Sequence, residues 1–437
     1  MLTKRSPQAS NADEGEIADV STKVRLLTRF PALQSRDFRL FWLGQGISAI
    51  GTFTQVWAVN WQLYALTHSP VALGMIGLLR VIPIVLFSML GGAIADAWDR
   101  RKVMLITQTV LALSAACLGL LTLLNRLTAF DIYVFTVVGA SAMAFDNPSR
   151  QSLIPRLVPR KDFASAVSLN MVVFRVATIS GPMIAGLLIA RGGLFVTYLI
   201  NSVSFVAVIL ALLAIRPRVD TEAPDTPPAK VNVEALLEGL AFVKNTPILV
   251  WTMALDFFAT FFSSANALLP IFAKDVLHVG ARGYGGLAAA EAVGALIAGV
   301  VISLGRPIKR QGLTVLWSVL LYGVATVIFG ASRIFIVSWI AFALTGAADA
   351  VSTVLRQTIR QLVTPDRLRG RMTAVNMVFF MGGPQLGELE AGLVAKWLGA
   401  PWSVITGGIG CLLTVAVVAY KGKVLREYEQ TETAHPQ

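Results

Sequence analysis

The chain has few of the residues that metal centres and disulfide scaffolds need. Among 437 residues there are 3 histidines and 2 cysteines. Cys117 and Cys411 lie far apart in apolar runs, so they predict neither a disulfide framework nor a metal site, and we expect both to be packing residues. His68, His278 and His435 fall outside the apolar runs, which excludes a histidine proton relay inside a membrane.

Charge is scarce as well. Only 14% of the residues are charged and 55% are hydrophobic, with a mean hydropathy of +0.68, whereas soluble domains carry roughly 25% charged residues. The composition therefore predicts a membrane protein. The net charge of +12 lies mostly in loops, so we expect no nucleic-acid partner. The first 40 residues lack the apolar core and cleavage site of a signal peptide.

Twelve apolar stretches are long enough to cross a bilayer as helices. This predicts an all-α integral membrane protein with twelve transmembrane helices. The stretches span residues 41–66, 70–95, 103–124, 130–153, 164–190, 194–215, 247–273, 282–304, 311–331, 333–359, 370–397 and 401–420. Of the 37 Lys and Arg residues, 29 fall on the side of the termini, 6 on the other and 2 inside the membrane. Both termini should therefore be cytosolic, in a multi-pass plasma-membrane (bacterial inner-membrane) protein.

A proline-rich segment after residue 215 divides the chain and predicts a flexible cytosolic linker. Just beyond it, Leu236, Leu240 and Val243 recur at helical spacing, which predicts a short helix on the membrane surface. The expected organisation is a cytosolic tail (1–32), a six-helix bundle (33–215), a linker with this helix (216–245), a second six-helix bundle (246–421) and a cytosolic tail (422–437).

The two bundles share a sequence repeat. Residues 151–187, together with the preceding Arg150, recur 206 positions later, so that Arg150 corresponds to Arg356 and Gly186 to Gly392. Two similar halves that rock against each other around a central site are the architecture of a secondary transporter.

The loop after the second stretch has a glycine, an aspartate four residues later and a basic cluster. These residues are Gly92, Asp96, Arg100, Arg101 and Lys102. The loop resembles the signature loop of the major facilitator superfamily, although a positive-inside turn has a similar composition. The resemblance implies two pseudo-symmetric six-helix bundles.

It also implies that Asp96 caps the start of the eleventh helix, near 370–373, and locks the cytosolic gate. Two departures stand out: Asp99 replaces the usual glycine, and the second half has Ser303 where the acid should be.

In the fifth stretch, Gly181, Pro182 and Gly186 resemble the motif of antiporters in this superfamily, with Ala185 in place of one glycine. Tight helix packing is the alternative explanation of such small residues. The segments that begin at Asp37 and Asp146 resemble the enterobactin-exporter branch, which also contains drug and macrolide efflux proteins. This likeness extends from about residue 33 to 420. It implies export but identifies no cargo.

Several charges fall within the predicted spans, where each costs about 2.5 to 3.5 kcal/mol at a helix centre unless it is paired or hydrated. They are Arg80, Arg175, Asp256, Glu291, Asp349, Glu388 and Glu390. Three helices also carry one-sided polar stripes: Gln45, Ser48, Thr52 and Gln55; Thr252, Asp256, Thr260 and Ser263; Thr345, Asp349, Thr353 and Arg356. The family resemblance places these helices around the cavity. Ordinary Ser/Thr bonding between helices is the alternative.

Asp256 is the leading candidate for proton coupling, because its helix has no basic residue, and Asp349 is the reserve candidate. Equal membrane depths, with the family's helix neighbours, predict two ion pairs between the halves: Arg80 with Glu388, and Arg175 with Glu291. Alternatively, each arginine meets backbone carbonyls or water.

The sequence favours a proton-coupled exporter of a small amphiphilic molecule such as a siderophore, drug or lipid-like compound, working by alternating access as a monomer without a cofactor. An importer or facilitator on the same fold is the first alternative. A membrane-embedded sensor or enzyme is the second, and the chain lacks the common hydrolase, metal and phosphate-binding motifs.

Overall fold

The computed structural model describes residues 30–215, 233–305 and 308–429, with the side chains of 88–97, 233–237 and five positions between 374 and 381 left out. Within these ranges every regular element is helical. The protein is an all-α membrane protein in which twelve long helices form two bundles. Helices of the first half are α2 (Arg36–Thr67), α3 (Pro70–Ala97), α4 (Arg100–Leu123), α5 (Ala129–Leu157), α6 (Phe163–Arg191) and α7 (Gly193–Ala214).

The second half begins with a short helix, α8 (Val233–Lys244), ahead of its own long helices. These are α9 (Pro247–Phe262) with its extension α10 (Leu269–Ile271), α11 (Gly280–Leu304), α12 (Gln311–Ala331), α13 (Phe335–Val363), α14 (Arg369–Leu398) and α15 (Ala400–Lys421); the short α16 (Lys423–Arg426) follows. Their bounds lie within a few residues of the predicted spans, apart from the break after α9. The domain boundaries proposed from the sequence remain predictions.

Ten of the described helical stretches are long and apolar enough to cross a membrane. The two long helices outside this set are α2 and α14. The described part of α14 is interrupted at five positions, and α2 includes the polar residues Gln45, Gln55 and Asn60.

The seventh predicted span, 247–273, is interrupted. The α-helix ends at Phe262, a 3-10 turn covers Asn266–Leu268, and a π-helical turn covers Phe272–Val276. Pro270 lies in this region, and a proline inside a helix removes one backbone hydrogen bond and clashes with the preceding turn. A straight helix through residue 270 is therefore disfavoured.

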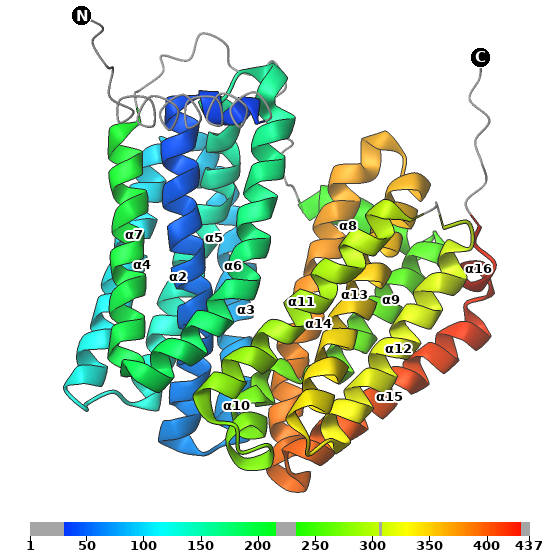
Figure 1. Cartoon of the computed structure of the whole chain (residues 1–437). Coiled ribbons are helices and arrows are strands. Elements are labelled where there is room, and N and C mark those ends of the chain that lie inside the picture. The colour runs from blue at the N-terminus through cyan, green and yellow to red at the C-terminus, as the bar shows by residue number, and fades with distance from the viewer. Residues whose placement is uncertain (1–29, 216–232, 306–307, 430–437) are drawn as a thin grey trace, which may run out of the picture.

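The two halves meet at one end of the molecule. We call the end with the start of α2 and the end of α15 the terminal end, and the opposite end the far end. Figure 1 shows the bundles close together at the far end and diverging toward the terminal end. Between the halves, α3 packs on α14 and α6 packs on α11, the neighbours that the family resemblance implies.

Glycines make these contacts between halves possible. A Cβ on Gly186 of α6 would lie 2.5 Å from the carbonyl oxygen of Ala281, and one on Gly285 of α11 would lie 2.5 Å from that of Pro182. A Cβ on Gly392 of α14 would lie 2.6 Å from the carbonyl oxygen of Pro70. Such backbone approach tolerates no side chain, so the contact between halves depends on small residues.

Polar contacts reinforce the far end. The Tyr284 hydroxyl donates to the carbonyl oxygen of Trp57 at 2.9 Å, and the Tyr64 hydroxyl donates to the carboxylate of Asp275. Lys274 lies 3.4 Å from the His68 ring. Each contact joins the first half to the second, so the far end is closed in this conformation.

The predicted surface helix is present as α8, but it packs on the second half. Val243 is buried in the core of that half, and Gly239 lies against the backbone of Arg371 on α14. Glu238 pairs with Arg371 and lies 3.8 Å from Arg367. This places α8 at the terminal end of α14. Leu240 is exposed, and the Leu236 side chain lies outside the described part.

The two cysteines are free. Cys411 is buried against α12, near the site where a Cβ on Gly323 would lie, as expected of a packing residue. Cys117 is exposed on α4, so the packing expectation was wrong for it. Helix periodicity turns this position outward, and an apolar run alone does not indicate which face is buried.

We predict that Gly186→Ala lowers the free energy of unfolding by about 1 to 3 kcal/mol, because the new methyl group forces α6 away from α11. Thermal unfolding of the purified protein measures the change. Gly299→Ala on α11 is the matched control, since its Cβ would meet nothing within 4 Å. Equal free energies of unfolding for the two variants would show that α6 and α11 can separate to admit the methyl group without loss of stability.

Candidate transport site

A buried ion-pair network lies between α9 and α13. Arg356 Nη2 is 2.8 Å from Asp256 Oδ1, and the side chains are 1% and 5% exposed. Arg360, one turn further along α13, lies 3.9 Å from Asp256 Oδ2 and donates to the side-chain oxygen of Asn376 on α14. Asp256 thus has two guanidinium groups beside it. Removing one partner of such a buried pair leaves an uncompensated charge in a dry environment.

Arg356 is also close to a second carboxylate. Its Nη2 atom lies 3.6 Å from Asp349 Oδ1, and it donates to the Thr353 hydroxyl at 3.0 Å. The Asp349 side chain is 41% exposed, whereas Asp256 is buried. One cation therefore stands between a buried and an accessible carboxylate. This arrangement allows Arg356 to favour one acid when the other accepts a proton.

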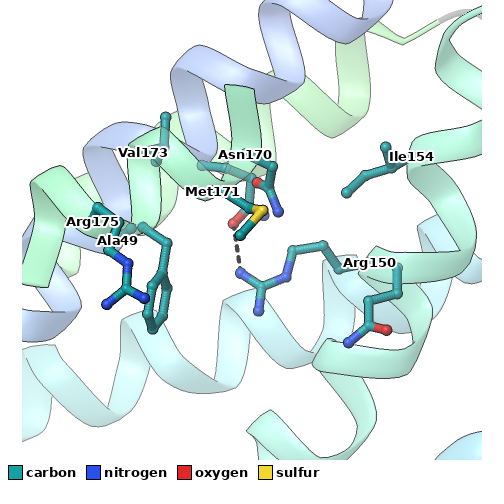
Figure 2. A pocket seen from close by; sticks show the side chains of 10 residues that line it. Ala49, Arg150, Ile154, Asn170, Met171, Val173 and Arg175 are labelled. Atoms are coloured by element: carbon teal, nitrogen blue, oxygen red, sulfur yellow. Dashed lines mark hydrogen bonds between the residues drawn. The ribbon is translucent and has the colours of Figure 1, made fainter. Parts of the chain in front are cut away.

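The first half has a related arrangement without a carboxylate. Arg150 of α5, the repeat partner of Arg356, donates to the side-chain oxygen of Gln45 at 3.2 Å and to that of Asn147. Figure 2 shows Arg150 and Arg175 extending into one cavity from α5 and α6. The cavity has a volume of about 350 Å³ and is lined by Gln45, Ala49, Arg150, Gln151, Ile154, Asn170, Met171, Val173, Phe174 and Arg175.

The polar stripe of α2 does not face one site. Gln45 contacts Arg150, but Gln55 accepts a hydrogen bond of 2.7 Å from Asn201 on α7. Ser48 is buried. Gln55 is therefore part of the packing between α2 and α7 within the first half.

Neither predicted ion pair between the halves is formed in this conformation. Among the described residues, no N···O distance of 4.0 Å or less joins Arg80 to Glu388 or Arg175 to Glu291. Glu291 accepts instead from Asn266 at 3.0 Å. The interrupted segment after α9 brings Asn266 to this acid, and helix-depth arithmetic did not anticipate that interruption.

Glu388 does face the first half. Its Oε2 atom would lie 2.7 Å from a Cβ on Gly77 of α3, and the charge of Arg80 on that helix reaches it. Arg175 is exposed, and its charge reaches Asp349. Depth matching therefore placed Glu388 beside α3, and the pair of Arg175 with Glu291 stays a prediction for another conformation.

The signature loop is described in part. Asp99 caps α4, accepting a hydrogen bond of 2.9 Å from the backbone N–H of Arg101, which gives the residue that departs from the family pattern a structural role. Arg101 also donates to the carbonyl of Leu213 at the end of α7. Arg100 begins α4. The side chains of Gly92 and Asp96, and with them the predicted cap, lie outside the described residues.

The antiporter-like segment of α6 packs on two helices. A Cβ on Gly181 would lie 2.5 Å from that of Phe53 on α2, and the Gly181 carbonyl accepts from the Thr54 hydroxyl at 3.2 Å. Pro182 and Gly186 contact α11 in the other half. The segment thus links packing within one half to the contact between halves.

Sequence reasoning missed Arg150, Arg360 and Asp146 as site residues. Asp146 on α5 is 1% exposed and accepts hydrogen bonds of 2.9 Å from Thr107 and Gln108 of α4. The repeat offered a signal for Arg150, because it aligns with Arg356. No group of three or more possible metal-ligating side chains occurs in the described part of the chain.

The chain matches a known family over almost its whole length. The family model of transmembrane secretion effectors, within the major facilitator superfamily, matches residues 27–436. The chain belongs to this family. It is 27% identical to the enterobactin exporters of Shigella boydii serotype 18 and Escherichia coli O81 over 412 residues, which cover 93% of this chain and 96% of each exporter. Its relatives are transporters, and the protein is a transporter rather than an enzyme.

Solved structures confirm the fold. A bacterial homologue of the iron transporter ferroportin, solved in an inward-facing state, matches with a TM-score of 0.65 and 17% identity, covering 90% of this chain and 99% of that one. A peptide transporter matches with a TM-score of 0.70 and 9% identity, covering 90% and 95%. The two-bundle architecture is therefore that of the superfamily.

We predict that Arg356→Gln destabilises the protein by about 3 to 5 kcal/mol, because it leaves Asp256 buried without its closest charge partner. Denaturant unfolding measures this loss. The double change Arg356→Gln with Asp256→Asn should recover a large part of it, since no unpaired carboxylate remains. Additive losses in the double variant would contradict an energetically coupled pair.

Proposed function

We propose that the protein is a secondary active transporter that exports a small amphiphilic molecule in exchange for protons, by alternating access. Arg356 carries this proposal, because it lies between the buried Asp256 and the accessible Asp349. When a proton neutralises one of the two acids, Arg356 pairs with the acid that is still charged. Protonation therefore changes the partner of Arg356 inside the second half.

Similarity and conformation support the export direction. The relatives that share 27% identity over most of both chains are named as enterobactin exporters. The contacts between halves gather at the far end, so the terminal end is the open one in this conformation. With cytosolic termini, as the distribution of Lys and Arg predicts, that opening faces the compartment from which an exporter takes its cargo.

We expect Asp256→Asn to abolish proton-gradient-driven transport while substrate exchange without a gradient persists. The amide cannot release a proton, yet it still accepts a hydrogen bond from Arg356. Flux into inverted vesicles with and without a proton gradient tests this. Asp366→Asn, at an acid that is 87% exposed in the loop before α14, is the control and should behave as wild type. Uphill transport by Asp256→Asn would transfer the coupling role to Asp349, for which Asp349→Asn is the corresponding variant.

We expect Asp96→Asn to shift the protein toward the conformation that is open at the terminal end, without changing ligand affinity from that side. The reason is that the family resemblance gives Asp96 a role in closing this end. Cysteine cross-linking between the terminal ends of α3 and α14 measures the distribution of states. An unchanged distribution would make Asp96 an ordinary loop residue.

The same vesicles separate export from import. An exporter accumulates cargo in inverted vesicles that are acidified inside, and an importer or facilitator does not. A panel of siderophores and drugs then identifies the cargo class.

A further inference from the structure

The two halves differ at equivalent positions. Arg150, Ile154 and Asn170 of the first half correspond to Arg356, Arg360 and Asn376 of the second. In the second half, Asp256 fills the space beside the repeated arginine and pairs with it at 2.8 Å. In the first half, the hydrogen-bond partners of that arginine among the described side chains are the neutral Gln45 and Asn147. The first half therefore has the cation without its carboxylate.

The space beside Arg150 is a cavity. The cavity has a volume of about 350 Å³ between α2, α5 and α6, it is partly open to the outside, and none of its lining residues is acidic. Arg175 lines the same cavity, and among the described residues its guanidinium has no ion pair or hydrogen bond. Figure 2 shows both arginines projecting into this space. Two positive charges thus share a cavity with no acid in its wall.

The neighbouring acids are engaged elsewhere. Asp146, one turn before Arg150 on α5, accepts hydrogen bonds from Thr107 and Gln108 on the α4 side. Asp349 of the other half has only a long-range electrostatic interaction with Arg175. Its Oδ1 atom lies 3.6 Å from Arg356 Nη2. The amide nitrogen of Gln45 is buried beside the cavity without a hydrogen-bond acceptor. A negatively charged oxygen can accept hydrogen bonds from both guanidinium groups and from the free N–H of Gln45.

We propose that this cavity binds the anionic group of the transported molecule, with its apolar body against Ile154, Met171 and Phe174. This deepens the proposed function by giving the cargo a chemical class: an amphiphile with a carboxylate or similar acidic oxygen. The position supports a place on the transport path. Gln45 and Arg150 belong to the first and fourth long helices, and the exposed Arg175 lies on α6, the helix that also contacts the second half.

A matched pair of probes tests the charge requirement. The full-length protein in nanodiscs of zwitterionic lipid is titrated with 2-naphthoate, with the uncharged 2-naphthamide and with the cationic 2-naphthylmethylamine. We expect the carboxylate to bind at least about tenfold more tightly than the amide, because charge-assisted bonds to arginine are lost with the charge. Equal affinities for the carboxylate and the amide would overturn the proposal.

Variants locate the site. Arg175→Gln should weaken naphthoate binding about tenfold and leave naphthamide binding unchanged, and Arg175→Lys should keep most of the affinity because the charge remains. Arg175 is exposed, so its replacement spares the fold. Arg191→Gln, at the far end of the same helix, is the control. A loss of naphthoate affinity that is equal in Arg175→Gln and Arg191→Gln would place the binding outside the cavity.

An anionic lipid headgroup has the same chemistry as a soluble cargo. Nanodiscs that contain phosphatidylglycerol separate the two sources: competition with naphthoate that disappears in Arg175→Gln identifies a lipid in the cavity, and its absence identifies the soluble anion. Both outcomes support an anion subsite. Because binding is measured without a gradient, it stands apart from transport. Gradient-driven flux without selective anion binding would refute the subsite alone, and anion binding without gradient-driven flux would refute the proposed coupling alone.

Discussion

The ion pair of Arg356 with Asp256 is the interaction around which the second half is organised. It joins α9 to α13 in a place where both side chains are almost fully buried, and Arg360 and Asn376 extend it to α14. A buried ion pair of this kind stabilises the fold no more than a pair of apolar residues of similar size would. Removing only one of its two charges, however, strongly destabilises the fold. Under the proposed proton coupling, the charges of this pair therefore serve a rearrangement rather than stability. The accessible Asp349, 3.6 Å from the same guanidinium, supplies the second position of that rearrangement.

Charge is divided unequally between the halves, although their sequences repeat. All five predicted intramembrane carboxylates belong to the second half, and both predicted intramembrane arginines belong to the first. The structure adds Arg150 and the buried Asp146 to the first half and Arg360 to the second. In the proposed mechanism, proton transfer takes place on α9, α11, α13 and α14, while α2, α5 and α6 surround a cationic cavity. Two similar scaffolds can thus take different tasks when a few side chains change.

The sequence predicted the fold well, because hydropathy determines which segments cross a bilayer, and the repeat indicates how they group. Site geometry was less predictable. Depth along a helix placed Glu388 beside α3, but it did not anticipate that Glu291 accepts a hydrogen bond from Asn266, because the interrupted segment after α9 decides which side chains meet there. Asp256 was identified for its lack of a basic neighbour on its own helix. Its actual partners come from α13, which only tertiary packing reveals.

The closed far end depends on glycines that let helices of the two halves approach to backbone contact. Gly186 and Gly285 bring α6 and α11 into backbone contact, and Gly392 does the same for α14 against α3. Since the same helices carry Arg175 and Glu388, the rocking motion of the proposed cycle would move each charge relative to the opposite half. At the terminal end of α14, Glu238 of α8 already holds Arg371. In the proposed alternating-access cycle, closing that end brings α14 toward α3, and α8 moves with α14 as long as the pair of Glu238 with Arg371 holds.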